Sequence, residues 1–158
     1  MTRVRVVGVG SPDAGDDAVG LLAVRAARLE LEEVPDVEVV ETGAGLHLVD
    51  LLDGVDAVVV VDAVRAPRGG RAAGTIVRAE AGPQGLPAEV GSSLSSHGFG
   101  VAEAVGLAAA LGDAPRVVFF GVEIADITAG HGLSGPVATA LPELVTRVVG
   151  EARLLSTH

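Results

Sequence analysis

The segment VDAVVVVDAV, Val55 to Val64, decides the fold class. Val55 to Val61 is a nearly continuous apolar run, and Asp62 closes it. A run of this kind is typical of a strand that is buried on both faces of a parallel sheet. An aspartate at the end of such a strand is expected to be partly buried, and a buried carboxylate needs a partner. Asp62 is therefore the first candidate functional residue.

Strands and helices alternate along the rest of the chain. The predicted strands are Val4 to Val9, Val37 to Thr42, Val55 to Val61, Thr75 to Ala79 as an edge strand, and Pro115 to Val122. The predicted helices are residues 17–32, Gly45 to Leu52, His97 to Leu111, and a last helix from a Ser134 cap to about Leu155. This alternation predicts one α/β domain over residues 1–158, with helices on both faces of a mostly parallel sheet.

The composition excludes several classes of function. The formal net charge is −10, which disfavours nucleic acid and anionic membrane surfaces as partners, because phosphate binding needs clustered Lys and Arg. The absence of cysteine excludes disulfides, thiolate nucleophiles and cysteine-ligated metal sites. No apolar run reaches the roughly 18 residues of a membrane span, and the N-terminus lacks the features of a secretory signal. We therefore expect a soluble, cytoplasmic protein.

Polar residues gather where the predicted strands end. Asp13, Asp16 and Asp17 follow the first strand, Asp62 ends the third, Glu123 and Asp126 follow the last, and His97 begins a helix after a long glycine-rich loop. Ligands of open α/β sheets bind outside the carboxyl ends of the strands. Two carboxylates and one imidazole suit a borderline divalent metal such as Zn²⁺ or Ni²⁺. The pattern indicates a metal-handling site made by Asp62, His97 and an aspartate of the Asp16–Asp17 pair.

Each of these residues also has a structural interpretation. Asp16 or Asp17 can simply cap a helix, and His97 can be an ordinary residue of a first helical turn. The turn GVGSPDAG resembles a dinucleotide-binding loop only loosely, since Asp13 holds the position of the third glycine and carboxylates repel phosphate. A nucleotide-binding module is therefore disfavoured. No H-E-x-x-H or G-x-S-x-G motif marks a common zinc protease or a serine hydrolase.

Four segments, in the same order along the chain, resemble the hydrogenase maturation proteases. They are GVGSPDAGDDAVG (Gly8 to Gly20), GAGLHLVDLLDGVDAVVVVDAV (Gly43 to Val64), SSHGFGVAEAVGLAAALG (Ser95 to Gly112) and VVFFGVEIADITAGHGLSGPVATALPELV (Val117 to Val145). The members of this family are endopeptidases that trim the C-terminus of the large subunit of nickel–iron hydrogenases. The resemblance implies a three-layer α/β sandwich around a twisted sheet of about five strands.

The resemblance also assigns roles to individual residues. Asp17, Asp62 and His97 occupy the metal-binding positions of the family motifs, which makes them the expected metal ligands and catalytic residues. Asp16 is then left with a capping or orienting role, and Glu123 is a second candidate for orienting a ligand. No role is assigned to His47, His131 or His158.

The function implied by the resemblance is the processing of a nickel–iron hydrogenase large-subunit precursor after nickel insertion. In this family the nickel is thought to arrive with the substrate, so no permanent cofactor is expected. The loops Arg65 to Gly74 and Gly82 to Ser96 are long enough to recognise a folded precursor. A protein that binds the metal centre without cutting, as a checkpoint or chaperone of its assembly, needs the same residues and remains the alternative.

Overall fold

The computed structural model describes residues 2–43, 45–67, 69–93, 99–112, 114–125, 127–128 and 130–157. Its strands are β1 (Val4–Val9), β2 (Val37–Thr42), β3 (Ala57–Arg65), β4 (Ile76–Glu80), β5 (Ser92–Ser93) and β6 (Arg116–Glu123). Its helices are α1 (Val19–Leu31), α2 (Gly45–Leu51), α3 (Val101–Leu111) and α4 (Gly135–Ser156), with the short 3₁₀ helices η1 (Gly15–Ala18) and η2 (Ala88–Val90).

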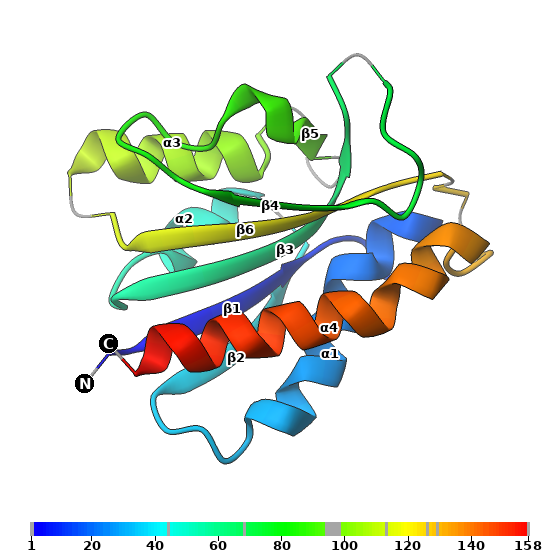
Figure 1. Ribbon diagram of the computed structural model, residues 1–158. Helices are drawn as coiled ribbons and strands as arrows, with labels where there is room; N and C mark the ends of the chain where they lie inside the picture. The colour runs from blue at the N-terminus through cyan, green and yellow to red at the C-terminus, as the bar shows by residue number, and fades with distance from the viewer. Residues whose placement is uncertain are drawn as a thin grey trace.

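The sheet forms the middle layer of three. Its main strands run in the order β2-β1-β3-β6-β4, with β2, β1, β3 and β6 parallel and β4 antiparallel at one edge. Helices α1 and α4 cover one face of the sheet, and α2 and α3 cover the other (Figure 1). The predicted α/β architecture is confirmed. In the described part of the chain, no helix combines the length and the apolarity needed to cross a membrane.

Strand β3 is the centre of the core. Every residue from Ala57 to Val64 is buried, because helices cover both sides of this strand. Its side chains alternate, so that Val59 and Val61 pack toward α1 and α4 while Val58 and Val60 pack toward α2 and α3. Burying one valine side chain contributes about 1.5 kcal/mol or more to folding. The interpretation of this apolar run as a doubly covered strand is confirmed.

β3 continues past its predicted end. The run was expected to stop at Asp62, but the strand extends to Arg65. Two partners hold the extension: β6 pairs with β3 as far as Val64, and the short strand β5 pairs with Val64 and Arg65. β5 and η2 both lie in the segment predicted to be irregular. Asp62 therefore lies within the strand, three residues before its end.

Glycines let the start of α1 lie directly against the sheet. A Cβ atom on Gly20 would meet the carbonyl oxygens of Val61 and Val9, the latter at 2.5 Å. A Cβ on Gly10 would likewise collide with the carbonyl oxygen of Asp17. The glycines of the first motif thus have a packing role, which brings η1 and α1 close to the ends of β1 and β3.

Replacing Gly20 by alanine is expected to lower the free energy of unfolding by about 2 kcal/mol or more, because both obstructing atoms belong to the backbone and cannot rotate away. Gly150 in α4 is the matched control, since a Cβ there meets no atom within 4 Å. Gly150→Ala is expected to stabilise the helix by about 0.5–1 kcal/mol. Urea unfolding of both variants measures the two changes in the free energy of unfolding, which are expected to have opposite signs. Equal changes would contradict this packing role of Gly20.

Candidate functional site

The candidate site lies beside a gap in the hydrogen-bond ladder of β3. On one side, β3 pairs with β1 up to Val61, which lies opposite Gly8. Pairing on that side resumes only at Val64, with β5. Among the described residues, Asp62 and Ala63 have no strand partner there, while β6 pairs with both of them on the other side. β1 has ended at this level, and η1 packs against β3 in its place.

Asp62 fills part of this gap with its own side chain. The residue is 0% exposed, and its Oδ1 accepts a hydrogen bond of 2.8 Å from the backbone N–H of Ala63. Because strand side chains alternate, Asp62 lies on the same face as Val60 and Val64, which is the face covered by α2 and α3. The sequence argument that this carboxylate is buried is confirmed. Its position as a metal ligand stays a prediction.

Asp17 carries a carboxylate oxygen without a partner. The residue is only 3% exposed, and its Oδ2 accepts a hydrogen bond of 3.2 Å from the backbone N–H of Ser11. Its Oδ1 is buried and has no hydrogen-bond partner within the described residues. Leaving a buried acceptor unsatisfied costs about 1–3 kcal/mol, and more when the group is charged. An unpartnered oxygen of this kind is a suitable ligand for a cation.

The surroundings of Asp17 disfavour its ionised form. Burial raises the pKa of its carboxyl above the ordinary range, and hydrogen bonding from Ser11 only partly opposes this effect. A bound cation reverses the balance, because it stabilises the carboxylate that burial penalises. The carboxyl of Asp17 is therefore poorly suited to a purely structural role and well suited to meeting a positive charge.

Asp16, by contrast, is fully used by the fold. It is 0% exposed, and its Oδ1 accepts a hydrogen bond of 2.7 Å from the backbone N–H of Ser134. Its Oδ2 accepts two more, each of 2.8 Å, from the backbone N–H of Ala125 and the hydroxyl of Ser134. Asp16 thus ties η1 to the end of β6 and to the N-terminus of α4, where a negative charge also favours the helix dipole.

The predicted helix caps therefore differ from the observed ones. In the described structure, neither η1 nor α1 has a side-chain cap, so Asp16 stabilises the start of α4 instead of its own helix. Ser134 stands at the N-cap position of α4, as predicted, but its hydroxyl donates to Asp16 and makes no cap hydrogen bond within α4. The sequence could not show this exchange, since the two residues are 118 positions apart.

Glu123 joins the loops around the end of β3. Its two carboxylate oxygens accept hydrogen bonds of 3.0 and 3.2 Å from the backbone N–H of Ala66. Its Oε1 also accepts from Nε of Arg71 at 2.9 Å. The Arg71 guanidinium in turn donates to the carbonyl oxygens of Glu89 and Val90. This partly buried pair fixes both loops that were expected to recognise a partner. Arg71 was not among the candidate residues of the sequence analysis.

The third predicted ligand, His97, lies outside the described residues, as does Asp126. The elements on either side of His97 are nevertheless placed: β5 pairs with the carboxyl end of β3, and α3 begins at Val101 beside β5. Within the described part of the chain, no three His, Cys, Asp or Glu residues gather closely enough to hold a metal ion. The side chains of His47 and His131 are exposed, and the structure gives neither residue a role in this site.

The structure therefore brings two of the three predicted ligands to one edge of the sheet, and their role stays a prediction. Asp17 and Asp62 both lie, buried, at the carboxyl edge where β1 ends beside β3, and Asp17 has an oxygen to spare. Asp16 and Glu123, which the sequence placed nearby, are engaged in tying loops and helices together. Two carboxylates of the predicted set fit a divalent cation that brings further ligands of its own.

Comparisons with known proteins agree with this architecture. The model of the hydrogenase maturation protease family matches residues 23–151, a range that includes Asp62 and His97 and begins after Asp17. The hydrogenase expression/formation protein HupD of Thiocapsa roseopersicina is 32% identical over 124 residues, which are 77% of this chain and 54% of that protein. The chain thus spans about half the length of this curated relative.

Solved structures give the same fold. The hydrogenase maturating endopeptidase HybD from E. coli superposes with a TM-score of 0.77 at 24% sequence identity, covering 96% of this chain and 93% of that one. The [NiFe] hydrogenase maturation protease HybD from Thermococcus kodakarensis superposes with a TM-score of 0.68 at 21% identity, covering 95% and 99%. At these identities the likeness establishes the fold.

Proposed function

Because the chain belongs to the hydrogenase maturation protease family, we propose that it is an endopeptidase that removes the C-terminal extension of a nickel–iron hydrogenase large-subunit precursor. The cut follows nickel insertion, and the protein recognises the nickel that the precursor carries. The nickel is therefore part of the substrate, and the protein needs no permanent cofactor. Asp17, Asp62 and His97 are the residues that complete the coordination of this nickel.

The observation that carries the proposal is the buried Oδ1 of Asp17, which has no hydrogen-bond partner among the described residues. A carboxylate in this state is costly to keep unless a cation meets it. Asp62 supplies a second buried carboxylate at the same edge of the sheet. Both are hard oxygen ligands that attract a divalent ion by charge, and a neutral imidazole at His97 adds a directional nitrogen ligand.

The chain's own residues position the reacting groups. Asp16 fixes η1 through hydrogen bonds from Ala125 and Ser134, and so holds the neighbouring Asp17 at the edge of the sheet. The backbone N–H of Ser11 donates to Asp17, and the backbone N–H of Ala63 donates to Asp62. These hydrogen bonds set the orientation of the two carboxylates. A metal held there polarises a carbonyl or lowers the pKa of a water molecule, which is the chemistry that peptide hydrolysis requires.

The alternative function is a checkpoint or chaperone that binds the nickel-loaded precursor without cutting it. Both functions use the same carboxylates, so the mass of the precursor distinguishes them. We would incubate the precursor from the same genome, with and without nickel, with this protein and measure its intact mass. Loss of one defined C-terminal peptide from the nickel-loaded form alone is expected.

Other outcomes would change the proposal. Cleavage of the nickel-free form would support the endopeptidase activity and contradict the recognition of nickel. Binding of the loaded precursor without any loss of mass would favour the checkpoint. Absence of both binding and cleavage would contradict the proposal altogether.

A further inference from the structure

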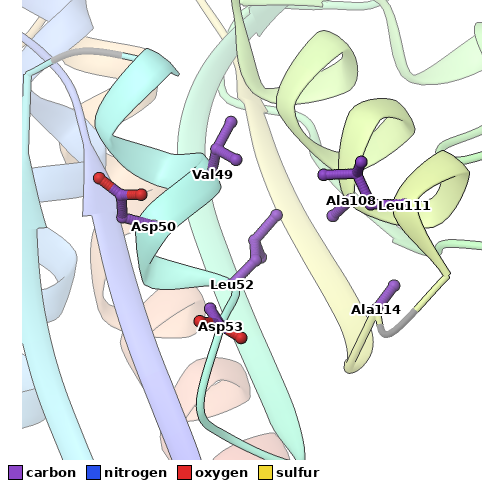
Figure 2. Close-up of a pocket in the computed structure, with 7 residues that line it drawn as sticks. All are labelled: Val49, Asp50, Leu52, Asp53, Ala108, Leu111 and Ala114. Atoms are coloured by element: carbon purple, nitrogen blue, oxygen red, sulfur yellow. The ribbon is translucent and has the colours of Figure 1, made fainter.

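A groove lies between the C-terminal ends of α2 and α3. It has a volume of about 310 Å³ and is lined by Val49, Asp50, Leu52, Asp53, Ala108, Leu111 and Ala114. Figure 2 shows the side chains of Val49 on α2 and of Leu52 just after this helix pointing toward Ala108 and Leu111 on α3, with Asp53 just below Leu52. Both helices run back from the carboxyl edge of the sheet, so this groove lies at the opposite edge from the candidate site.

The outer face of α3 continues this apolar surface toward the candidate site. From Ala104 to Gly112 the sequence AVGLAAALG contains no charged or polar side chain. Leu107 is 40% exposed and Leu111 is 72% exposed, one helical turn apart on the same face. The helices on the other side of the sheet differ, since α1 and α4 present Arg25, Arg28 and Arg147 to solvent. Two exposed leucines on an uncharged helix face offer apolar surface to a partner.

The two ends of α3 connect the groove with the candidate site. α3 starts beside β5, which pairs with the carboxyl end of β3, and it ends at the groove. A helix of 11 residues is about 16 Å long. A folded partner that reaches Asp17 and Asp62 can therefore extend along α3 and into the groove, whereas a short peptide at the site cannot.

The charge at the groove defines the chemistry of the occupant. Asp50 and Asp53 are exposed, and the Asp53 carboxylate has no hydrogen-bond or ion-pair partner among the described residues. The C-terminal end of α3 adds partial negative charge and has no basic residue in its last turn. No Arg is among the residues that line the groove, and the nearby Arg5, whose guanidinium donates to the carbonyl oxygens of Leu51 and Asp53, is already paired with Glu38. The groove is thus apolar in its walls and negative at its mouth.

We propose that this groove and the exposed face of α3, through Leu107 and Leu111, dock the body of the large-subunit precursor away from the bond that is cut. The docked segment presents aliphatic side chains to Val49, Ala108 and Leu111, with a Lys or Arg that reaches Asp53. This inference rests on the proposed function and adds to it the surface that selects the substrate.

A second copy of this chain is a poorer occupant. A twofold axis across α3 would set the Asp53 carboxylate of one copy near the Glu103 carboxylate at the start of α3 in the other. Like charges would then face each other at both ends of the contact. A partner with a basic residue at one end avoids this repulsion.

The test compares two substitutions of Leu111 in processing assays with the nickel-loaded precursor. Leu111→Lys is expected to raise KM at least about tenfold, with kcat unchanged, because docking contributes equally to the ground state and the transition state. Leu111→Glu is expected to raise KM less, since a carboxylate there still attracts the basic residue. Leu29 on α1 is the matched control, because it is 71% exposed on the opposite face of the sheet. Leu29→Lys is expected to leave KM unchanged.

Several results would overturn the docking surface. A KM for Leu111→Lys equal to that of the wild-type protein would do so directly. Equal increases in KM for Leu111→Lys and Leu111→Glu would show that the docked segment carries no basic residue near Asp53. A wild-type dimer that Leu111→Lys converts to a monomer, with KM unchanged, would identify a second copy as the occupant. If the wild-type protein neither binds nor cuts the precursor, the proposed function fails and the docking surface fails with it.

Discussion

Asp17→Asn is expected to make the protein more stable at neutral pH and to abolish precursor processing. The folded protein buries this carboxyl, and burial raises its pKa above that of the unfolded chain. Asparagine keeps an oxygen that can accept the N–H of Ser11 and removes the buried charge. If Asp17 coordinates the substrate's nickel, the same change removes a ligand, and the rate of processing falls at least about a hundredfold.

The gain in stability has a definite pH dependence. Between the pKa of the unfolded chain, about 3.9, and the raised pKa of the folded state, the folded protein holds a proton that the unfolded chain has lost. The wild-type protein therefore loses stability as the pH rises through this window, and the penalty is complete above the folded pKa. The advantage of Asp17→Asn is expected to be complete above the raised pKa of the folded state and to shrink as the pH falls from that value toward 4.

Urea unfolding at several pH values, together with single-turnover processing, measures both effects. Asp62→Asn is the matched variant for activity, because its amide oxygen can still accept the N–H of Ala63. It too is expected to lose processing at least about a hundredfold while remaining folded. Full processing activity in Asp17→Asn or in Asp62→Asn would show that the substituted residue does not coordinate the substrate's nickel. Lower stability of Asp17→Asn at pH 7 would show that its carboxylate has a partner in the fold.

The neighbouring substitution, Asp16→Ala, is expected to have the opposite effect on stability. Removing this carboxylate leaves three donors without their acceptor, two on Ser134 and one on Ala125. Hydrogen bonds to a charged acceptor contribute about 1.5–3 kcal/mol each, so a loss of about 4 kcal/mol or more in the free energy of unfolding is expected. The start of α4 would separate from η1.

Ser134→Ala is the control for this prediction. It removes only the hydroxyl donor and keeps the backbone N–H that bonds to Asp16 Oδ1, so a loss of about 1–2 kcal/mol is expected. Urea unfolding of both variants compares the two losses. An Asp16→Ala protein as stable as the wild type would mean that Asp16 does not hold η1 and α4 together.

The sequence was sufficient for the architecture because its strongest signals are local. The valine run before Asp62 is compatible with little except a central strand, and the described structure buries it on both faces. The two-residue strand β5 was missed, since two serines carry no periodic pattern and pair only because β3 extends beyond Asp62. Boundaries of this kind depend on neighbouring strands that lie far away in the sequence.

The residue types of the candidate site could be predicted from the sequence, but the role of each residue could not. Asp16 and Asp17 are adjacent and chemically identical, and only contacts with Ala125 and Ser134 show that the first is saturated. Only the three-dimensional surroundings of Asp17 leave its Oδ1 without a hydrogen-bond partner within the described structure. Arg71 gave no signal in the sequence, because an arginine in a glycine-rich loop is usually solvated, whereas here it pairs with the buried Glu123.

The most direct test of the central claim is diffraction at the nickel absorption edge from crystals of the protein soaked in Ni²⁺. The account predicts one strong anomalous peak within bonding distance of Asp17 Oδ1, the Asp62 carboxylate and the His97 imidazole. It also predicts that this peak disappears from crystals of Asp17→Asn. Nickel bound only at other carboxylates, or a peak at the site that Asp17→Asn leaves unchanged, would contradict the assignment of these residues to the substrate's nickel.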